Sequence, residues 1–171
     1  AIFIINVYFP YFERSPAYRA DISLYAGFIE NILSCHSNTR VILTGDMNFD
    51  IDTSNDGYLI LKGLLDEFNL VACDVLDRDH KCTYFSETLQ SSSNIDHFFV
   101  SANLFAAVSC YQVVDSGCNP SDHHPVSIDF SFNHNNGSKL HEHSSAKIPL
   151  FKVRWDKGNL SKLYNSTGFW F

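Results

Sequence analysis

The sequence lacks the signatures of several large classes of protein. No apolar stretch approaches the roughly 20 residues that a transmembrane helix needs. No G-x-S-x-G motif is present, which argues against a serine hydrolase of the α/β-hydrolase type. The five cysteines include no C-x-x-C pair, and a zinc site from Cys118, His123 and His124 would lack the usual paired spacing. We interpret the cysteines as reduced, mostly buried thiols of an intracellular protein.

Positive charge is scarce in most of the chain and gathers at its end. Residues 1–132 carry 6 basic and 17 acidic side chains, a net charge of −11, whereas residues 133–171 carry 6 basic and 2 acidic ones, a net charge of +4. The acidic part argues against non-specific DNA binding driven by its own charge. It does not exclude a phosphate substrate, because bound cations can be the largest local charges in such a site.

The apolar content is sufficient for one packed domain. Of the 171 residues, 45% are hydrophobic, including 15 phenylalanines and 8 tyrosines. We assign this domain to residues 1–132, a polar linker to residues 133–147, and a basic, aromatic tail to residues 148–171. The chain opens directly in the apolar run 1–8, so we expect it to be a fragment of a longer protein.

Apolar periodicity predicts strands interleaved with helices, and hence an α/β layered domain. In the first helix, Leu24, Phe28, Ile32 and Cys35 recur at helical spacing and form the expected apolar face. A serine-rich loop is expected before Ile95. The predicted strands cover residues 2–9, 40–44, 70–73, 95–101, 107–115 and 125–132, and the predicted helices cover residues 18–35 and 58–68.

Polar side chains gather where predicted strands end, and loops at the rim of a sheet are where sites are usually built. These clusters are Tyr8, Asp46 with Asn48, Asn94 with Asp96, and the segment 121–124. Each has an ordinary structural reading as well. Asp46 and Asn48 suit Asx turns, Asp96 suits an exposed edge strand, and His123 suits a half-buried histidine with satisfied hydrogen bonds. Both readings stay open at this point.

Taken together, these side chains suit hydrolysis of a phosphodiester. That reaction needs neutralised phosphoryl oxygens, an oriented water and a stabilised leaving oxygen. Asp122 offers a hard oxygen ligand for Mg²⁺. His123 can donate to the phosphate, and Asp96 can fix the tautomer of that histidine. Asp46 and Asn48 can accept from the attacking water and position it.

Three motifs occur in order and at suitable distances: GDMNFD at 45–50, NIDHFFVS at 94–101 and SDHHPVSI at 121–128. They resemble the G-D-x-N, I-D-H/Y and S-D-H-x-P-V motifs of the endonuclease/exonuclease/phosphatase superfamily. NVYFP at 6–10 resembles its strand that ends in a catalytic tyrosine. The resemblance implies an α/β fold, part of a four-layer α/β/β/α sandwich (DNase I-like). The amino-terminal half of the sandwich, with a principal metal-ligating glutamate, would then be missing from this chain.

The resemblance also implies a role for each matching residue. Tyr8 would contact the phosphate, Asp46 would polarise the nucleophilic water, and Asn48 would orient that water. His123 would be the catalytic histidine, and Asp96 would orient it.

The cofactor implied by the resemblance is Mg²⁺, with Mn²⁺ as a substitute, held by Asp122 and Asp46. Thr83 matches a threonine that precedes an aromatic residue in the superfamily, and we interpret it as structural. His97 and His124 fall at positions that we expect to be variable.

The segment VRWDKGNLSKLYNSTG at 153–168 resembles the connection between endonuclease and reverse transcriptase in non-LTR (LINE-type) retrotransposon polyproteins. There the domain nicks chromosomal DNA. This implies a DNA substrate, a reverse transcriptase domain in the parent polyprotein, and a nuclear location, with the cytoplasm also open. The lack of a long apolar stretch predicts no membrane partner. Two alternatives remain. One is a phosphatase of the same superfamily acting on inositol or lipid phosphates, and the other is a non-catalytic remnant or partner-binding fragment.

Overall fold

Short strands and two longer helices follow one another much as the apolar segments of the sequence predict. The structure, a computed structural model, describes residues 2–11, 13–36, 39–53, 55–77, 82–114 and 121–132. The predicted linker and tail lie outside the described residues. The strands are β1 (Ile2–Tyr8), β2 (Arg40–Asp46), β3 (Leu70–Ala72), β4 (Tyr84–Ser86), β5 (Ser91–Ser93), β6 (Asp96–Ser101), β7 (Val108–Val113) and β8 (Val126–Phe130). The helices are α1 (Pro16–Cys35), α2 (Asp56–Glu67), α3 (Ala102–Phe105) and the 3₁₀ helix η1 (Cys73–Leu76).

The central sheet has the strand order β1-β2-β6-β3. β1 runs parallel to β2, and their register places Tyr8 beside Asp46. β6 pairs antiparallel with β2 and places Asp96 on the other side of Asp46. Three residues from distant parts of the sequence therefore form one lateral row at one end of the sheet, in the order Tyr8, Asp46, Asp96.

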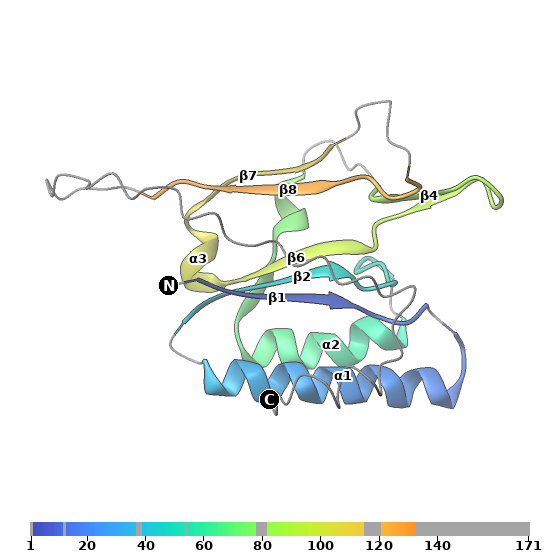
Figure 1. Cartoon of the computed structure of the whole chain (residues 1–171), viewed down its shortest axis with the longest axis horizontal. Helices are drawn as coiled ribbons and strands as arrows, with labels where there is room; N and C mark the ends of the chain where they lie inside the picture. The colour runs from blue at the N-terminus through green and yellow to red at the C-terminus, as the bar shows by residue number, and fades with distance from the viewer. Residues whose placement is uncertain are drawn as a thin grey trace, which may run out of the picture. The chain divides into compact units, whose positions relative to one another are not determined.

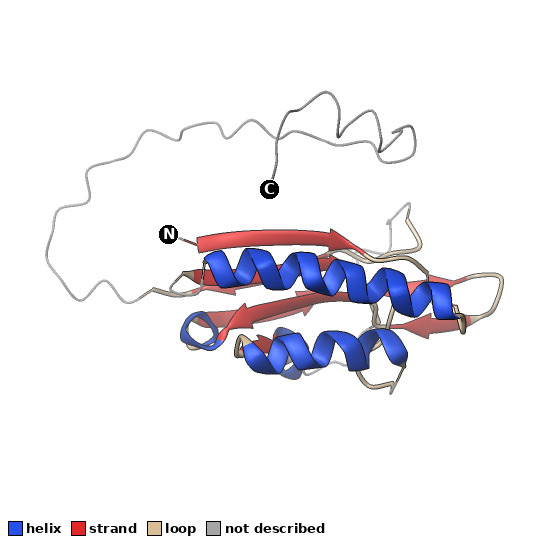
Figure 2. Ribbon diagram, turned by 90° about the horizontal axis from the view of Figure 1, so that it is seen from below, coloured by secondary structure: helices blue, strands red, loops and turns tan. Residues whose placement is uncertain are grey.

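Helices α1 and α2 cover one face of this sheet and lie side by side (Figure 1, Figure 2). Each helix begins at a capping side chain. The Oγ of Ser15 accepts from the N–H of Tyr18 at 3.1 Å, and the Oδ1 of Asn55 accepts from the N–H of Tyr58 at 2.9 Å. Burying one large apolar side chain contributes roughly 1.5–3 kcal/mol. The layer between helices and sheet buries, among others, Ile22, Leu33, Leu43, Leu61 and Phe99.

The opposite face of the sheet is covered by the antiparallel pair β7–β8 (Figure 1). A second apolar cluster, which includes Ile42, Leu104 and Tyr111, fills the space between the two sheets. β6 is buried on both faces, because Phe99 packs toward the helices and Val100 packs toward β7–β8. The described residues thus form a mixed α/β fold with three layers, helices, sheet and sheet, as the predicted sandwich requires.

The apolar face predicted for α1 is wrong. Leu24 and Phe28 are 57% and 53% exposed. The stripe that packs on the sheet is the neighbouring one, with Tyr18, Ile22, Ala26, Ile29 and Leu33 buried. Both stripes have a helical period, so spacing alone does not reveal which one the sheet selects.

Two smaller expectations also need correction. The serine-rich segment before Ile95 contains the strand β5, which pairs with β4 in a hairpin. Serine is not among the residues enriched in strands, so the sequence carried no signal for it. Of the four described cysteines only Cys73 is buried, and Cys35, at the end of α1, is exposed.

No helix among the described residues combines the length and apolar character needed to cross a membrane.

Candidate active site

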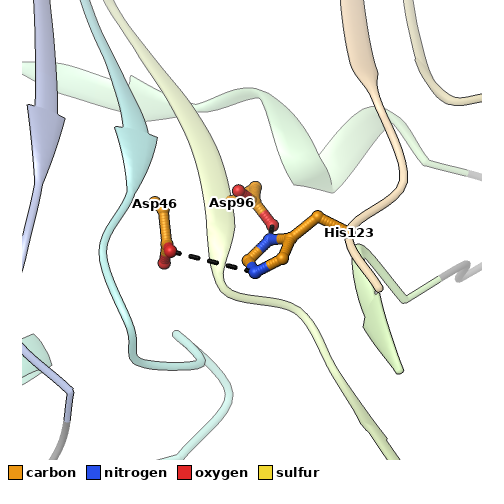
Figure 3. A group of neighbouring side chains, drawn as sticks. All are labelled: Asp46, Asp96 and His123. Atoms are coloured by element: carbon orange, nitrogen blue, oxygen red, sulfur yellow. Dashed lines mark hydrogen bonds and ion pairs between the residues drawn. The ribbon is translucent and has the colours of Figure 1, made fainter. Parts of the chain in front are cut away.

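A histidine from the segment before β8 completes the row of strand ends. His123 forms an isolated bridge with β4. Two main-chain hydrogen bonds hold its segment there, from the N–H of Phe85 to the carbonyl of Asp122 at 2.9 Å and from the N–H of His124 to the carbonyl of Thr83 at 2.7 Å. The imidazole of His123 thereby comes to lie beside the ends of β2 and β6 (Figure 3).

His123, Asp96 and Asp46 form one continuous group (Figure 3). The Nδ1 of His123 lies 2.9 Å from the Oδ2 of Asp96, and its Nε2 lies 4.0 Å from the Oδ2 of Asp46. Because an ionised carboxylate only accepts, Nδ1 donates to Asp96 and the second ring nitrogen faces Asp46. An aspartate that orients a histidine in this way is the arrangement used in hydrolase triads.

The charge of Asp46 is disfavoured by its surroundings. Burial raises the pKa of the Asp46 carboxyl, and the neighbouring charge of Asp96 raises it further, whereas the N–H of Asn48 and the imidazole of His123 act in the opposite direction. Two carboxylates close together repel, so a cation or a shared proton stabilises them. This is the electrostatic setting of a metal or acid–base site.

The loop after β2 is an Asx turn that also builds the site. The N–H of Asn48 donates to the Oδ1 of Asp46 at 2.9 Å, and the side-chain amide of Asn48 donates to the carbonyl of Phe9 at 2.8 Å. Asn48 adopts a left-handed φ of 52°, which asparagine tolerates better than most residues. The loop is therefore both an ordinary Asx turn and part of the candidate site, because the turn orients the carboxylate of Asp46.

Three of these side chains have the spacing of metal ligands. One ligand atom from each of Asp46, Asp96 and His123 lies within 4.8 Å of the other two. Carboxylate oxygens suit Mg²⁺, which usually takes one or two of them and keeps several waters. Imidazole nitrogen suits softer metals, and the Nδ1 of His123 is already bonded to Asp96. The two carboxylates therefore fit Mg²⁺, and His123 fits a hydrogen-bonding role beside it.

Besides Asn48, which is hydrogen-bonded to Asp46, two predicted site residues lie outside this group. The carboxylate of Asp122 is exposed and lies 3.5 Å from the Oγ of Ser121. It lines a cavity of about 500 Å³ next to β4, whereas Asp96 and His123 line another of about 410 Å³. Tyr8 is 70% exposed at the end of the row. The metal role of Asp122 and the phosphate contact of Tyr8 stay predictions.

Two buried polar side chains, those of Thr83 and His97, lie next to the candidate site. The Oγ1 of Thr83 accepts from the N–H groups of Ile95 and Asp96, both at 3.0 Å, and so fixes the start of β6. This is the structural role expected for Thr83. His97, at a position that we expect to be variable, is 1% exposed and hydrogen-bonded at both ring nitrogens. Its pattern in the sequence, a histidine among apolar strand residues, is also that of an ordinary core position.

The comparisons with known proteins identify the fold. No protein-family model matches the sequence, and no curated protein matches it. Solved structures do match. The 3′ phosphatase NExo from Neisseria, bound to a product DNA hairpin, gives a TM-score of 0.58 at 23% identity, over 75% of this chain and 61% of its own. The endonuclease domain of TRAS1, a telomere-specific non-LTR retrotransposon, gives 0.57 at 19% identity, over 71% and 55%. An AP endonuclease from Archaeoglobus fulgidus gives 0.59 at 16% identity, over 77% and 62%.

The chain has a DNase I-like fold. It spans 55% to 62% of the length of these three structures. At such identities the likeness shows the fold alone. Within that DNase I-like fold, Asp46 ends β2, Asp96 begins β6, and His123 lies in the segment before β8, so the group gathers at one end of the central sheet.

Proposed function

We propose that this chain carries catalytic side chains of a metal-dependent phosphodiesterase that nicks DNA. The observation that carries the proposal is the group of Asp46, Asp96 and His123 at the strand ends of a DNase I-like fold. Two carboxylates and an oriented imidazole are suited to orienting a water and stabilising charge on a phosphoryl group. The fold is shared with nucleases and phosphatases, one of which was solved with DNA.

Each side chain has a role that its geometry permits. Asp46, held by Asn48, accepts a hydrogen bond from the attacking water and turns it toward the phosphorus. His123, oriented by Asp96, donates from Nε2 to a phosphoryl oxygen when its ring is protonated. Tyr8, exposed at the other end of the row, contacts the phosphate.

The proposed cofactor is Mg²⁺, with Mn²⁺ as a substitute. Such a cation supplies positive charge for the phosphoryl and leaving oxygens. Asp46 and Asp96 are the carboxylates whose spacing fits it. Asp122, directly before His123 in the chain, is the further ligand that the sequence motif predicts.

We also place this domain in a non-LTR retrotransposon polyprotein, with a reverse transcriptase as its partner and the nucleus as its site of action. The order of the three motifs, the segment 153–168 and the likeness to the TRAS1 domain support this placement. Similarity to a 3′ phosphatase keeps phosphatase activity as the second candidate. Coverage of 55% to 62% of the neighbours keeps the non-catalytic fragment as the third.

Plasmid nicking tests the proposal. The 171-residue chain, and the longest open reading frame that contains it, are incubated with supercoiled plasmid in Mg²⁺, Mn²⁺ or EDTA. We expect nicking that requires the metal. His123→Ala and Asp46→Ala should each lower the rate on the order of 10²–10⁴-fold while the fold is kept. The control is Asp66→Ala, which removes an exposed carboxylate of α2 that pairs with Lys62.

Each outcome decides a separate point. Full activity in His123→Ala or Asp46→Ala removes that residue from the mechanism. No nicking by either wild-type protein contradicts the endonuclease assignment. Release of inorganic phosphate from 3′-phosphorylated DNA or from inositol phosphates, in place of nicking, would favour the phosphatase instead.

A further inference from the structure

The buried histidine of β6 joins two segments that frame the candidate site. The Nδ1 of His97 lies 2.7 Å from the Oδ2 of Asp74 in η1, and its Nε2 lies 2.9 Å from the carbonyl oxygen of Phe49. Phe49 belongs to the loop 47–50, which directly follows Asp46. The buried imidazole of His97 thus connects the main chain of the loop 47–50 to the carboxylate of Asp74.

The partners of this imidazole determine where its protons lie. A carbonyl oxygen only accepts, so the Nε2 of His97 donates to Phe49. The second ring nitrogen faces a carboxylate oxygen, so one further proton lies between Nδ1 and Asp74. Burial lowers the pKa of His97, but the hydrogen bond and charge of Asp74 and the carbonyl of Phe49 outweigh it, and the pKa is raised. The bond to Phe49 is therefore kept whichever partner holds that proton.

The rest of this loop is attached to the residues just before β6. The N–H of Met47 donates to the carbonyl of Ile95 at 2.9 Å. The N–H of Asn94 donates to the carboxylate of Asp50 at 3.2 Å, and its side-chain amide donates to Asp74 at 3.1 Å. The bonds of Met47 and Asp50 lie before and after Phe49, so the carbonyl of Phe49 is attached between them.

We infer that His97 is a positioning residue of the proposed nuclease, whose bond to the Phe49 carbonyl keeps Asn48 in the geometry that turns Asp46 toward His123. The inference rests on the proposed function. Asn48 has an unusual backbone conformation and donates its N–H to Asp46. A residue in that conformation persists only where its neighbours hold it.

A purely packing role would not require a histidine here. Phe99, two residues further along β6, faces the same helical layer, and its ring centroid lies 5.7 Å from that of His97. Phe99 fills the core without hydrogen bonds from its side chain. Alternation along the strand places Asp96 on the opposite face, so consecutive residues of β6 orient both His123 and the loop.

Two amide substitutions separate the two bonds of the ring. The amide nitrogen of asparagine reaches about as far as Nδ1, and that of glutamine reaches about as far as Nε2. His97→Asn therefore keeps the bond to Asp74 and loses the one to Phe49, whereas His97→Gln keeps the bond to Phe49. Asp74→Asn is a third variant, in which a neutral imidazole still donates to Phe49. Phe99→Leu is the packing control, in the same strand and layer.

Two readouts are measured on the full chain, and only folded variants are compared. In plasmid nicking, His97→Asn should lower kcat by roughly 10-fold to 100-fold with a smaller change in KM. Amide hydrogen exchange reports on the loop without any activity, and His97→Asn should speed exchange of the Asn48 N–H about tenfold. His97→Gln, Asp74→Asn and Phe99→Leu should each stay within about threefold of wild type in both readouts.

The two readouts distinguish failure of this inference from failure of the proposed function. If the wild type does not nick plasmid, the proposed function fails, and the exchange of the Asn48 N–H still decides the role of His97. Equal effects of His97→Asn and His97→Gln would overturn the inference. A tenfold change of kcat or of Asn48 N–H exchange in Asp74→Asn would also overturn it, and this test remains available if neither variant of His97 folds. An effect of Phe99→Leu as large as that of His97→Asn would overturn it as well.

Discussion

Replacing Gly45 by alanine should destabilise the sheet at the point where the site begins. Gly45 is the residue before Asp46 in β2 and has a φ of +134°, a conformation that residues with a Cβ rarely adopt. A Cβ built there would overlap the carbonyl oxygen of Val7 and lie 2.8 Å and 2.9 Å from its carbonyl carbon and nitrogen. All three atoms belong to the main chain of β1, which pairs with Gly45 in parallel register.

The cost of Gly45→Ala follows from these two effects. Backbone strain at such a φ costs roughly 1–3 kcal/mol. Forcing an additional carbon into a packed region typically costs about 1–3 kcal/mol more, and here no flexible side chain can move aside. The total, about 2–6 kcal/mol, is a large part of the roughly 5–15 kcal/mol that stabilises a typical domain. At about 3–5 °C per kcal/mol, the melting temperature should fall by roughly 6–30 °C.

Urea unfolding followed by far-UV circular dichroism measures this loss. The matched control is Gly63→Ala in α2, where an added Cβ meets no atom within 4 Å. Because alanine favours helix, this control should stabilise the fold by about 0.5–1 kcal/mol. A free energy of unfolding for Gly45→Ala within about 1 kcal/mol of wild type would refute the argument from backbone contact.

Three further predictions concern charge and accessibility. Burial, together with the charge of Asp74, raises the pKa of the Cys73 thiol to about 12. Iodoacetamide at pH 8 should therefore label exposed Cys35 and leave Cys73 unlabelled in the folded chain. Equal labelling of the two cysteines, measured by peptide mass spectrometry, would contradict this. The pKa of His97 is raised in the folded state, so protonation of His97 stabilises the fold. This stabilisation is complete below about pH 6.5 and is lost as the pH rises through the folded-state pKa. Urea titrations from pH 6 to 9 should show this fall in wild type and a flatter profile in His97→Gln. Mg²⁺ should raise the melting temperature of wild type, and a shift of equal size in Asp46→Asn would remove that carboxylate from the metal site.

The sequence predicted the candidate site best where reactive polar side chains stand at the ends of predicted strands. Asp46, Asp96 and His123 were predicted as one site from short motifs, and the structure brings them into one group. What joins them is strand register, which pairs Asp46 with Asp96, and the short bridge that places His123 against β4. The short motifs predict which residues belong to the site, but they do not reveal the strand pairing that brings these residues together.

The failures have physical causes of their own. The wrong stripe of α1 was chosen because Leu24 and Phe28 satisfy the same period as Ile22 and Ile29, and only the sheet surface distinguishes them. The hydrogen bonds of His97 could not be predicted, because its partners, Asp74 and the main chain of residue 49, are distant in sequence, and one of them is a carbonyl group that every residue possesses.

The lateral row of Tyr8, Asp46 and Asp96 also has a kinetic consequence. Each of these side chains comes from a different strand, and the pairs β1–β2 and β2–β6 join segments that are far apart along the chain. Contacts of this kind require long loops to close and therefore form late relative to local helices. During refolding, α1 and α2 can gain their hydrogen bonds before any two members of the row have met. Recovery of the site is thus a measure of completed sheet assembly, and it should lag behind the recovery of helical signal.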